Sequence, residues 1–422
     1  MGSYFKCVRC GMIYESSNEF LCSCGGPLEV IHDTASWSRS VVDSRLCPMD
    51  VPYCSGVWRF KELIHPSLDT RLIVTRPEGN TNIYKRRSLS DYTGISNLSL
   101  KHEGENPTGS FKDRGMTVAI SEAIRLKVNS VACASTGNTS ASMAAYAAQV
   151  GLKGLVFIPK GEIAYGKLSQ AIAYGSQVIQ VDGNFDNAMT LVQKVSKELG
   201  LYLLNSLNPW RIEGQKSIVF ELIQQRGWVP PDWIILPAGN LGNTSAFGKA
   251  LRELVELGWI DKVPRLAAIQ AELANPFFQL WSHKDEKLKP IKPETIASAI
   301  KIGNPVSWEK ALNSIKGTDG VVEVVSDDEI MDAKSNVDRS GIGCEPASAA
   351  SVAGARKLRE KDVIKPTDDV VCILTGNLLK DPETTMNYYQ GKLNGVKTKV
   401  TNPIHSLDGG SIDSLRRLLD SA

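Results

Sequence analysis

Lys112 lies in the stretch whose residue types most clearly suggest chemistry, EGENPTGSFKDRGM at residues 103–116. A proline and a glycine before the lysine predict a turn, and the residues from Lys112 to about Arg125 have helical spacing. At the start of a helix, backbone N–H groups and the positive end of the helix dipole disfavour the charged form of a lysine. The whole string therefore favours a free amine that attacks a carbonyl carbon, whereas the tripeptide KDR alone would fit a solvated lysine.

A second stretch, ASTGNTSAS at residues 134–142, is typical of an anion-binding turn. It follows a predicted strand and precedes an alanine-rich helix, so its polar side chains surround a glycine at a helix N-terminus. Free backbone N–H groups at such an end bind carboxylates, although the same residue types also serve as ordinary helix caps. The candidate ligands are Ser135, Thr136, Asn138 and Thr139.

A third stretch, PAGNLGNTSA at residues 237–246, also follows a predicted strand. Its glycines and asparagines permit a backbone nest whose N–H groups converge on a phosphate, or a glycine-rich turn without a ligand. The stretch lacks the Lys-Ser/Thr ending of a nucleotide P-loop and the third glycine of a dinucleotide fingerprint, so ATP is not indicated. The candidate residues are Gly239, Asn240, Leu241, Gly242 and Asn243.

A fourth stretch, LTGNLLKDP at residues 374–382, places Thr375 at the end of a strand candidate. Ligands gather at the carboxyl ends of strands in open α/β sheets, so this hydroxyl would face the same crevice as the turns above. A simple helix cap is the alternative interpretation of this threonine.

Four of the nine cysteines cluster near the N-terminus as Cys7-x-x-Cys10 and Cys22-x-Cys24. Four thiolates are the number for a closed, tetrahedral structural zinc site, which leaves no open position for catalysis. The first pair has the spacing of a zinc knuckle, whereas the second pair is one residue shorter than usual. Structural zinc and a degenerate ribbon with reduced thiols are therefore both open interpretations.

The elements that must position these residues alternate along the chain from about residue 36 onward. Apolar runs of strand length are followed by helix-length amphipathic segments, a βαβ rhythm that predicts parallel sheets covered by helices on both faces. A chain of 422 residues is expected to form two or three domains. The strand candidates are 130–135, 154–159, 176–182, 232–239, 265–271 and 370–376, and the helix candidates include 141–150, 190–199 and the C-terminal 411–422.

The composition argues against several classes of partner. Lys and Arg total 48 against 46 Asp and Glu, a net charge of +2, so no nucleic-acid partner is expected. No apolar run approaches the roughly 20 residues of a membrane span, and the polar N-terminus contains no signal-peptide core. We therefore expect no membrane association and a cytoplasmic protein.

Seven strings follow one another in the order EGENPTGSFKDRGM, ASTGNTSAS, NSLNPWRIEGQK (205–216), PAGNLGNTSA, SAIKIGNPVSW (298–308), GCEPASAAS (343–351) and LTGNLLKDP. Together they resemble the threonine synthases, which are fold-type II pyridoxal-phosphate enzymes related to tryptophan synthase β and threonine dehydratase. The resemblance runs from about residue 55 to residue 382. The N-terminal CxxC…CGG also looks like a ribbon that some threonine synthases carry.

The resemblance implies a fold and a domain division. We expect an α/β protein with two open parallel-sheet domains, the cofactor in the cleft between them, and a small Cys-rich, zinc-ribbon-like knob at the N-terminus. The ribbon would occupy residues 1–35, and residues 36–205 would include the smaller mobile domain and the cofactor lysine. The large domain with the phosphate loop would occupy residues 206–388, and a tail residues 389–422. The family is commonly dimeric, so a homodimer is expected.

The resemblance also implies which residues hold pyridoxal 5′-phosphate. Lys112 would carry it as a Schiff base, and Asn138 would hydrogen-bond its ring hydroxyl. The run Gly239, Asn240, Leu241, Gly242 and Asn243 resembles the loop that holds the cofactor phosphate. Thr375 matches the hydroxyl residue that faces the pyridine nitrogen. A neutral hydroxyl there keeps the ring a moderate electron sink.

Substrate-binding residues follow from the same resemblance. Ser135, Thr136 and Thr139 would bind the substrate carboxylate. Asn205, Ser206 and Arg211 resemble the binding site for the substrate phosphate, with Asn240 as a further candidate. A guanidinium is suited to this role because it pairs bidentately with phosphate. One departure is Leu378, which stands where the family usually has glycine and would narrow the crevice near the cofactor.

The activity implied by the resemblance is conversion of O-phospho-L-homoserine and water into L-threonine and phosphate. Two other enzymes remain open alternatives: a cysteate synthase, which uses O-phosphoserine and sulfite, and a threonine dehydratase, which needs no second phosphate site. A third alternative is a binding module whose ribbon recruits a partner and whose catalytic domain is inactive.

Overall fold

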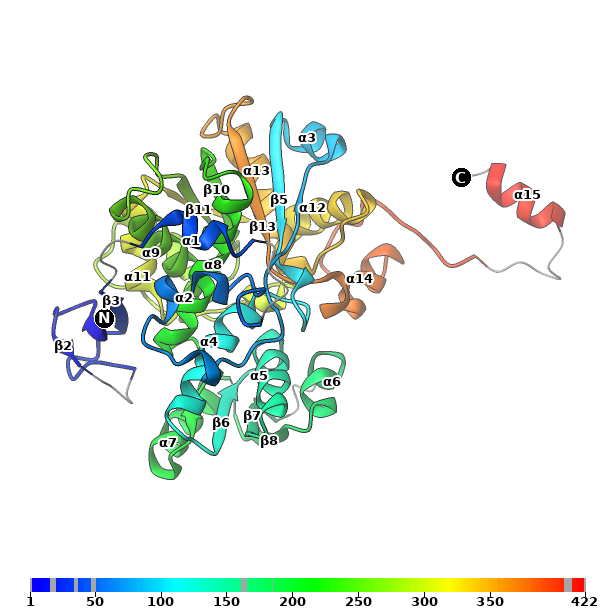
Figure 1. Ribbon diagram of the computed structural model, residues 1–422. Coiled ribbons are helices and arrows are strands. Elements are labelled where there is room, and N and C mark those ends of the chain that lie inside the picture. The colour runs from blue at the N-terminus through cyan, green and yellow to red at the C-terminus, as the bar shows by residue number, and fades with distance from the viewer. Residues whose placement is uncertain are drawn as a thin grey trace.

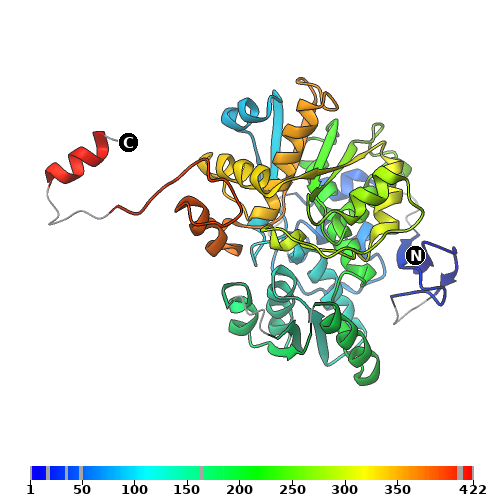
Figure 2. The same cartoon turned by 180° about the vertical axis from the view of Figure 1, so that it is seen from behind.

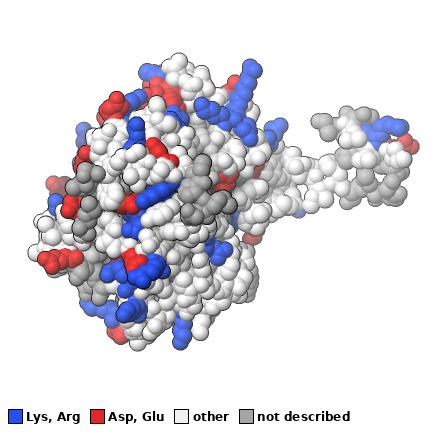
Figure 3. Space-filling model, in the orientation of Figure 1, with Lys and Arg blue, Asp and Glu red and all other residues white. Residues whose placement is uncertain are grey.

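The structure is a computed structural model that describes residues 2–15, 20–33, 37–46, 51–160, 165–183, 185–405 and 412–420. Figure 1 shows a small N-terminal ribbon, an upper layer built on a six-stranded sheet and a lower layer built on a four-stranded sheet. After residue 389 the chain returns past the helix at residues 327–339, where Lys399 pairs with Asp332 at 2.9 Å, and both views then show it leaving the body and ending in a helix that lies away from it (Figures 1 and 2). Basic and acidic side chains are intermingled on the face in Figure 3, in line with the net charge of +2.

The helices fall mostly between strands, as the βαβ rhythm predicts. Within the described residues, no helix is both long enough and apolar enough to cross a bilayer. The helices are α1 (Arg39–Asp43), α2 (Lys61–Ile64), α3 (Arg87–Thr93), α4 (Lys112–Arg125), α5 (Asn138–Gln149), α6 (Tyr165–Ala173), α7 (Phe185–Leu199), α8 (Pro209–Gln225), α9 (Gly242–Glu256), α10 (Pro276–His283), α11 (Trp308–Gly317), α12 (Asp327–Arg339), α13 (Pro346–Glu360), α14 (Pro382–Tyr389) and α15 (Ile412–Asp420).

The large layer is the six-stranded sheet with the helices that cover it. Alternate residues of its central strand point to opposite sides: Ile234 and Leu236 pack with residues of α8, α9 and α11, and Ile235 packs with residues of α12 and α13. Its strands are parallel except β4, in the order β12-β11-β10-β13-β5-β4. Their bounds are β4 Ile83–Tyr84, β5 Asn97–His102, β10 Trp233–Pro237, β11 Arg265–Ala271, β12 Val321–Val325 and β13 Asp369–Leu374.

The small layer is the four-stranded sheet with α5, α6 and α7. Its strands are all parallel, in the order β8-β7-β6-β9, and helices α5 and α7 both pack against β6 and β7. A parallel sheet covered in this way buries apolar strands, and Val131, Val156 and Ile158 are fully or almost fully buried. The strands are β6 Ser130–Ala134, β7 Lys153–Pro159, β8 Gln177–Val181 and β9 Tyr202–Leu203.

The N-terminal ribbon is a three-stranded antiparallel sheet that docks on the large layer near the start of α8. The imidazole of His32 pairs with Glu213 at 2.7 Å, and the ring of Phe5 meets that of Trp210 edge-on at 5.9 Å. Lys310 of α11 donates to the Leu28 carbonyl at 2.5 Å. The strand order is β2-β1-β3, with bounds β1 Ser3–Cys7, β2 Ile13–Tyr14 and β3 Leu28–His32.

The six strand candidates and the three helix candidates of the sequence are confirmed, with differences only at their ends. Strands β5 and β12 were not among the candidates. Strand β5 is NLSLKH and contains a buried lysine, Lys101, whose charge is neutralised by Glu221 far along the chain at 2.6 Å. Through β4 and β5, the region 36–205 contributes strands to the large layer as well as forming the small one.

Helices α4 and α8 cross with their backbones in close contact. A Cβ atom added at Gly214 would lie 1.9 Å from the carbonyl oxygen of Arg114, and one added at Gly115 would lie 2.7 Å from that of Arg211. Two helices ordinarily pack with their axes 8–10 Å apart, and small residues at the crossing permit a closer approach. Only glycine therefore fits at this crossing.

We predict that Gly214→Ala destabilises the protein by at least about 2 kcal/mol, because the new methyl group overlaps a backbone atom that cannot move freely. Denaturant unfolding of the purified protein measures the loss. Gly317→Ala is the matched control, since Gly317 is also helical and a Cβ there meets nothing within 4 Å. Equal stability of the two variants would show that the crossing adjusts without cost.

Candidate active site

Lys112 is the first residue of α4, as the sequence predicts. The loop before it is fixed from two sides. The Thr108 backbone N–H and hydroxyl donate to the Asp113 carboxylate at 2.7 and 2.6 Å, and the Phe111 N–H donates to the Thr375 carbonyl at 3.0 Å. The lysine is thus held where the end of β13 meets the start of α4.

The Lys112 side chain is half-buried, and its Nζ lies 4.2 Å from the centre of the Phe111 ring. Within the part of the chain that the structure describes, no hydrogen bond or ion pair engages this amine. Burial is the main cause that lowers the pKa of Lys112 to about 7; the Arg211 guanidinium adds to the shift and Glu345 opposes it. A large fraction of the amine is therefore unprotonated and nucleophilic at neutral pH.

The turn between β6 and α5 presents the polar side chains that the sequence predicts. Ser135, Thr136 and Thr139 are half-buried there, and the Ser135 hydroxyl accepts a hydrogen bond from the Gly137 N–H at 3.1 Å. Asn138 is the first residue of α5, so the free N–H groups of a helix N-terminus lie beside these hydroxyls. The arrangement can bind a small anion.

Arg211 lies in the first turn of α8 and is 1% exposed. One guanidinium nitrogen donates to the Leu204 carbonyl at 3.2 Å, whereas Nε and the other terminal nitrogen have no partner among the described residues. Burial lowers the pKa of Arg211 to about 10. A buried guanidinium with two unused donors is costly unless an anion completes it, so this position fits a phosphate or carboxylate ligand.

Asn205 and Ser206 come just before α8 and differ in their surroundings. Asn205 is buried, and its side chain pairs with the backbone of Ala134, accepting from the N–H and donating to the carbonyl at 2.9 Å each. It therefore fixes the end of β6, directly before the Ser135 turn. Ser206 is half-buried beside it. The substrate-phosphate role of both residues stays a prediction.

The glycine-asparagine stretch forms the start of α9. Leu241 is its N-cap residue and has a left-handed backbone, with φ +63°, a conformation uncommon for a leucine. Gly239 and Gly242 flank the turn, where a Cβ at Gly239 would lie 3.1 Å from the Cα of Ile300. Asn240 is half-buried next to them. The free N–H groups of the new helix are available to a phosphate at this turn.

Buried polar atoms without partners gather around the start of α9. Within the described residues, Asn243 Oδ1, Thr244 Oγ1 and Gln215 Oε1 have none. Gln215 links this turn to the lysine helix: its Nε2 lies 3.2 Å from a Cβ position at Gly115, and its Oε1 lies 3.3 Å from one at Gly242. Buried polar groups are rarely left unsatisfied, so these atoms indicate a polar ligand or water next to α4.

Thr375 follows the last residue of β13 and is 5% exposed. Its hydroxyl lies 3.0 Å from that of Ser348 on α13, and its backbone oxygen holds the lysine loop. Leu378, two positions beyond Gly376, packs over the backbone of Gly343, with its Cδ2 3.2 Å from the Cβ position there. Whether Leu378 narrows the crevice stays a prediction.

Glu345 is the functional candidate that sequence reasoning missed. The Asn138 amide nitrogen lies 3.1 Å from each of its carboxylate oxygens, which joins the small layer to the large one. Glu345 is 5% exposed, and burial raises its pKa. The string GCEPASAAS contains it and Ser348, but a buried glutamate before a helix has no local signal that distinguishes it from an ordinary cap.

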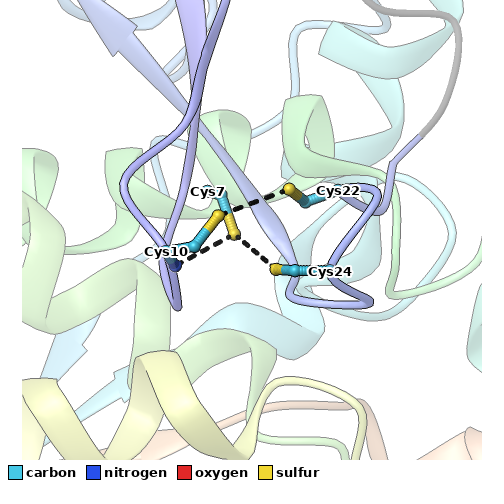
Figure 4. Close-up of side chains that lie close together, drawn as sticks. All are labelled: Cys7, Cys10, Cys22 and Cys24. Carbon is cyan, nitrogen blue, oxygen red and sulfur yellow. Dashed lines mark hydrogen bonds between the residues drawn. The ribbon is translucent and has the colours of Figure 1, made fainter.

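The four ribbon cysteines point toward a common centre (Figure 4). Their sulfur atoms all lie within 4.8 Å of one another, and the pairs Cys7–Cys24 and Cys10–Cys22 are both separated by 3.6 Å. Four thiolates on a tetrahedral zinc ion stand about 3.8 Å apart, given a Zn–S bond of about 2.3 Å, so the shape of the cluster fits the ion. The shorter CxC pair contributes both of its sulfurs.

The residues around Lys112 fit the pyridoxal phosphate that the sequence resemblance implies. The cofactor needs an unprotonated amine for its aldehyde, which Lys112 would supply, and backbone donors for its phosphate, which the start of α9 would supply. The buried atoms without partners on Gln215, Asn243 and Thr244 lie at that turn. Arg211 is close enough to lower the pKa of the same amine, and it would offer a further anion site.

A scan against protein families matches residues 74–376 to the pyridoxal-phosphate dependent enzyme family. The threonine synthase of Methanocaldococcus jannaschii is 46% identical over 384 residues, which cover 90% of this chain and 94% of that protein. Threonine synthase 2, chloroplastic, of Arabidopsis thaliana is 39% identical and covers 94% and 80% respectively.

Solved structures show the same fold at low sequence identity. Maize serine racemase superposes with a TM-score of 0.65 at 22% identity and covers 80% of this chain and 96% of its own. The processed form of threonine deaminase isoform 2 from Solanum lycopersicum superposes with a TM-score of 0.62 at 22% identity and covers 71% and 84%. The fold-type II arrangement expected from the sequence is confirmed, and the chain belongs to the pyridoxal-phosphate-dependent enzyme family and, within it, to the threonine synthases.

Proposed function

We propose that this chain converts O-phospho-L-homoserine and water into L-threonine and phosphate, with Lys112 as the residue that carries the cofactor. The observation that supports the proposal most is the buried Arg211 guanidinium, two of whose nitrogens lack a partner, near an amine with a pKa of about 7. The amine suits the cofactor, and the guanidinium suits a second anion such as the substrate phosphate. Relatives named threonine synthase favour the same substrate.

Pyridoxal phosphate, when bound, supplies the electron sink that makes the α- and β-protons of the substrate removable. In the proposed reaction the Lys112 amine removes the α-proton and one β-proton and later returns protons at the γ- and α-carbons, while the proton left over from water goes to the released phosphate. Arg211 holds the phosphate while the bond between the γ-carbon and oxygen breaks. The oxygen of water ends on the β-carbon of threonine, and a hydrogen takes the place of phosphate on the γ-carbon.

The remaining assignments place the cofactor and substrate around these two residues. We assign the ring hydroxyl to Asn138, the cofactor phosphate to the start of α9 at residues 239–243, and the pyridine nitrogen to Thr375. The substrate carboxylate is assigned to Ser135, Thr136 and Thr139, whose hydroxyls lie beside a helix N-terminus. A neutral threonine at the ring nitrogen favours β,γ chemistry over transamination because it does not stabilise a protonated ring.

We also propose an assembly and a location for the protein. A homodimer in the cytoplasm follows from the family resemblance and from the sequence features described above.

We further propose that Cys7, Cys10, Cys22 and Cys24 bind one structural zinc ion. The 3.6 Å separations of two sulfur pairs support it. So does Gly26, since a Cβ there would lie 2.8 Å from the Cys7 sulfur and crowd the cluster.

We predict that Lys112→Ala removes the absorbance of bound cofactor and lowers turnover at least about a thousandfold, since one amine carries both cofactor attachment and proton transfer. Visible absorbance spectra and phosphate release from phosphohomoserine measure the two effects. Lys289→Ala, which removes an exposed lysine that pairs with Asp285, should change neither. A Lys112→Ala protein that stays yellow and active would end this assignment.

We predict that Arg211→Ala lowers kcat/KM for phosphohomoserine about a hundredfold, because a buried charge-assisted contact to the phosphate is lost. The cofactor dissociation constant should change by less than about threefold in the same variant. Ligand-free thermal stability should hold or rise, because the wild-type guanidinium is buried with two unused donors. Equal losses in substrate use and cofactor binding would remove Arg211 from the substrate site; the exposed Arg87→Ala is the control.

We predict that protein purified without chelators contains about one zinc ion per chain and that Cys7→Ser loses it, because a structural site needs all four thiolates. Elemental analysis of the two proteins measures the metal. Cys54→Ser, which changes a half-buried cysteine outside the cluster, should keep the zinc. A metal-free wild-type protein with four reduced thiols would support the degenerate ribbon instead.

A further inference from the structure

Glu345 occupies an unusual position for a buried carboxylate in this protein. It is the N-cap residue of α13, and its backbone N–H donates to the Gly376 carbonyl at 3.1 Å. Within the described residues it has no ion-pair partner, and the one side-chain group that donates to it is the Asn138 amide. By contrast, the buried Glu221 is compensated by Lys101 at 2.6 Å and Arg114 at 2.8 Å.

The space for this carboxyl group is made by glycine at the end of β13. A Cβ at Gly376 would lie 2.3 Å from Glu345 Oε1, so any other residue there would displace the carboxyl group. Gly376 also pairs with Ser110 in a β-bridge two residues before Lys112. The Glu345 carboxyl group therefore lies close to Gly376, the residue that pairs with Ser110 in the loop before Lys112.

Four charged or polar groups face Glu345 from the surrounding elements. Burial and Asp381 raise its pKa, whereas Asn138, Lys380 and Lys112 lower it, and the net shift is upward. Loss of the Asn138 hydrogen bond would therefore raise the pKa of Glu345 further.

The contact determines which way the Asn138 amide faces. An ionised carboxylate only accepts hydrogen bonds, so it selects the NH2 end of an amide and turns the oxygen away. The amide nitrogen carries two hydrogens, so one remains for a second acceptor when the other is held by Glu345. That second acceptor is the cofactor ring oxygen in the function proposed above.

We propose that Glu345 is a positioning residue that fixes the Asn138 amide with its nitrogen toward the ring oxygen of the cofactor. The proposal rests on the proposed function, which assigns that oxygen to Asn138. Because Asn138 belongs to the small layer and Glu345 to the large one, the same contact links cofactor binding to the approach of the two layers.

Glu345→Gln tests the role with little change in shape. The new amide is able to donate to Asn138 Oδ1, so the Asn138 amide no longer has to present its nitrogen to the cofactor. We expect the cofactor to leave the holoenzyme about tenfold faster and its absorbance maximum to shift, as expected for the loss of one hydrogen bond to a charged group. The readouts are cofactor release after dilution and the visible spectrum, neither of which needs turnover.

A double-mutant cycle separates positioning from a direct or merely structural effect. Asn138→Ala should also speed release about tenfold, and the double variant should differ from Asn138→Ala by less than about threefold. Glu323→Gln is the matched control, since it changes another buried carboxyl group, paired with Lys361 away from the lysine loop, and should leave release unchanged. If Glu345→Gln does not fold, Glu345→Asp takes its place in the cycle with the same expectation.

Two results would overturn the inference: unchanged release from Glu345→Gln, or multiplication of the two single effects to about a hundredfold in the double variant. Either can occur while wild-type protein still carries its cofactor on Lys112, in which case the proposed function stands. A wild-type protein whose cofactor is absent or attached elsewhere would instead overturn the proposed function.

Discussion

The backbone contact between α4 and α8 determines where Lys112 and Arg211 lie, the two side chains proposed to carry the cofactor and to bind the substrate phosphate. Lys112 and Arg211 each stand three residues before the glycine of the crossing, which is about one helical turn. Because Gly115 and Gly214 bring the helices together without side chains between them, the first turns of both helices become neighbours. The guanidinium then lowers the pKa of the amine, and burial shifts both groups in the same direction. A larger residue at either glycine would separate the two groups as well as destabilise the fold.

A buried group of charges keeps this crossing in register. Arg114 donates to Glu103 at 2.6 and 2.8 Å and to Glu221 of α8 at 2.8 Å, and Glu221 also accepts from Lys101 of β5 at 2.6 Å. Burying these charges costs desolvation energy, which their mutual attraction offsets only when every donor has an acceptor. Here they join the lysine helix to α8 and to the sheet. Because Lys112 is the first residue of α4, the position of that helix determines where the lysine side chain points.

Local patterns predicted the parts of the site that consist of one strand and the turn after it. The turns at 237–246 and 374–382 follow the neighbouring parallel strands β10 and β13, whose carboxyl ends share one edge of the large sheet, so their meeting was predictable. The turn at 134–142 follows β6 of the small sheet, and its approach to the other two depends on how the two layers pack. Features that depend on partners far along the chain could not be predicted in this way. The charge of Lys101 within a buried strand is compensated by Glu221, and Glu345 becomes notable through its contact with Asn138, 207 positions away. The cysteine spacing left zinc open because a CxC pair is ambiguous in sequence; in the structure the four sulfurs lie within 4.8 Å of one another, an arrangement that is compatible with the ion.

The fold alone does not specify the reaction. Structures of a serine racemase and a threonine deaminase share the frame at 22% identity, so the lysine helix, the sheet edge and the covering helices are compatible with different chemistry. The reaction must then depend on side chains that this frame presents. At the start of α8 the chain buries an arginine, two of whose guanidinium nitrogens have no partner among the described residues, and such a group is costly unless an anion completes it. The ribbon lies against the neighbouring residue, where Phe5 and His32 flank the Trp210 ring and His32 pairs with Glu213. The N-terminal ribbon is therefore part of the packing that holds the first turn of α8, so the position proposed for the substrate phosphate is supported from outside the two layers as well as from within them.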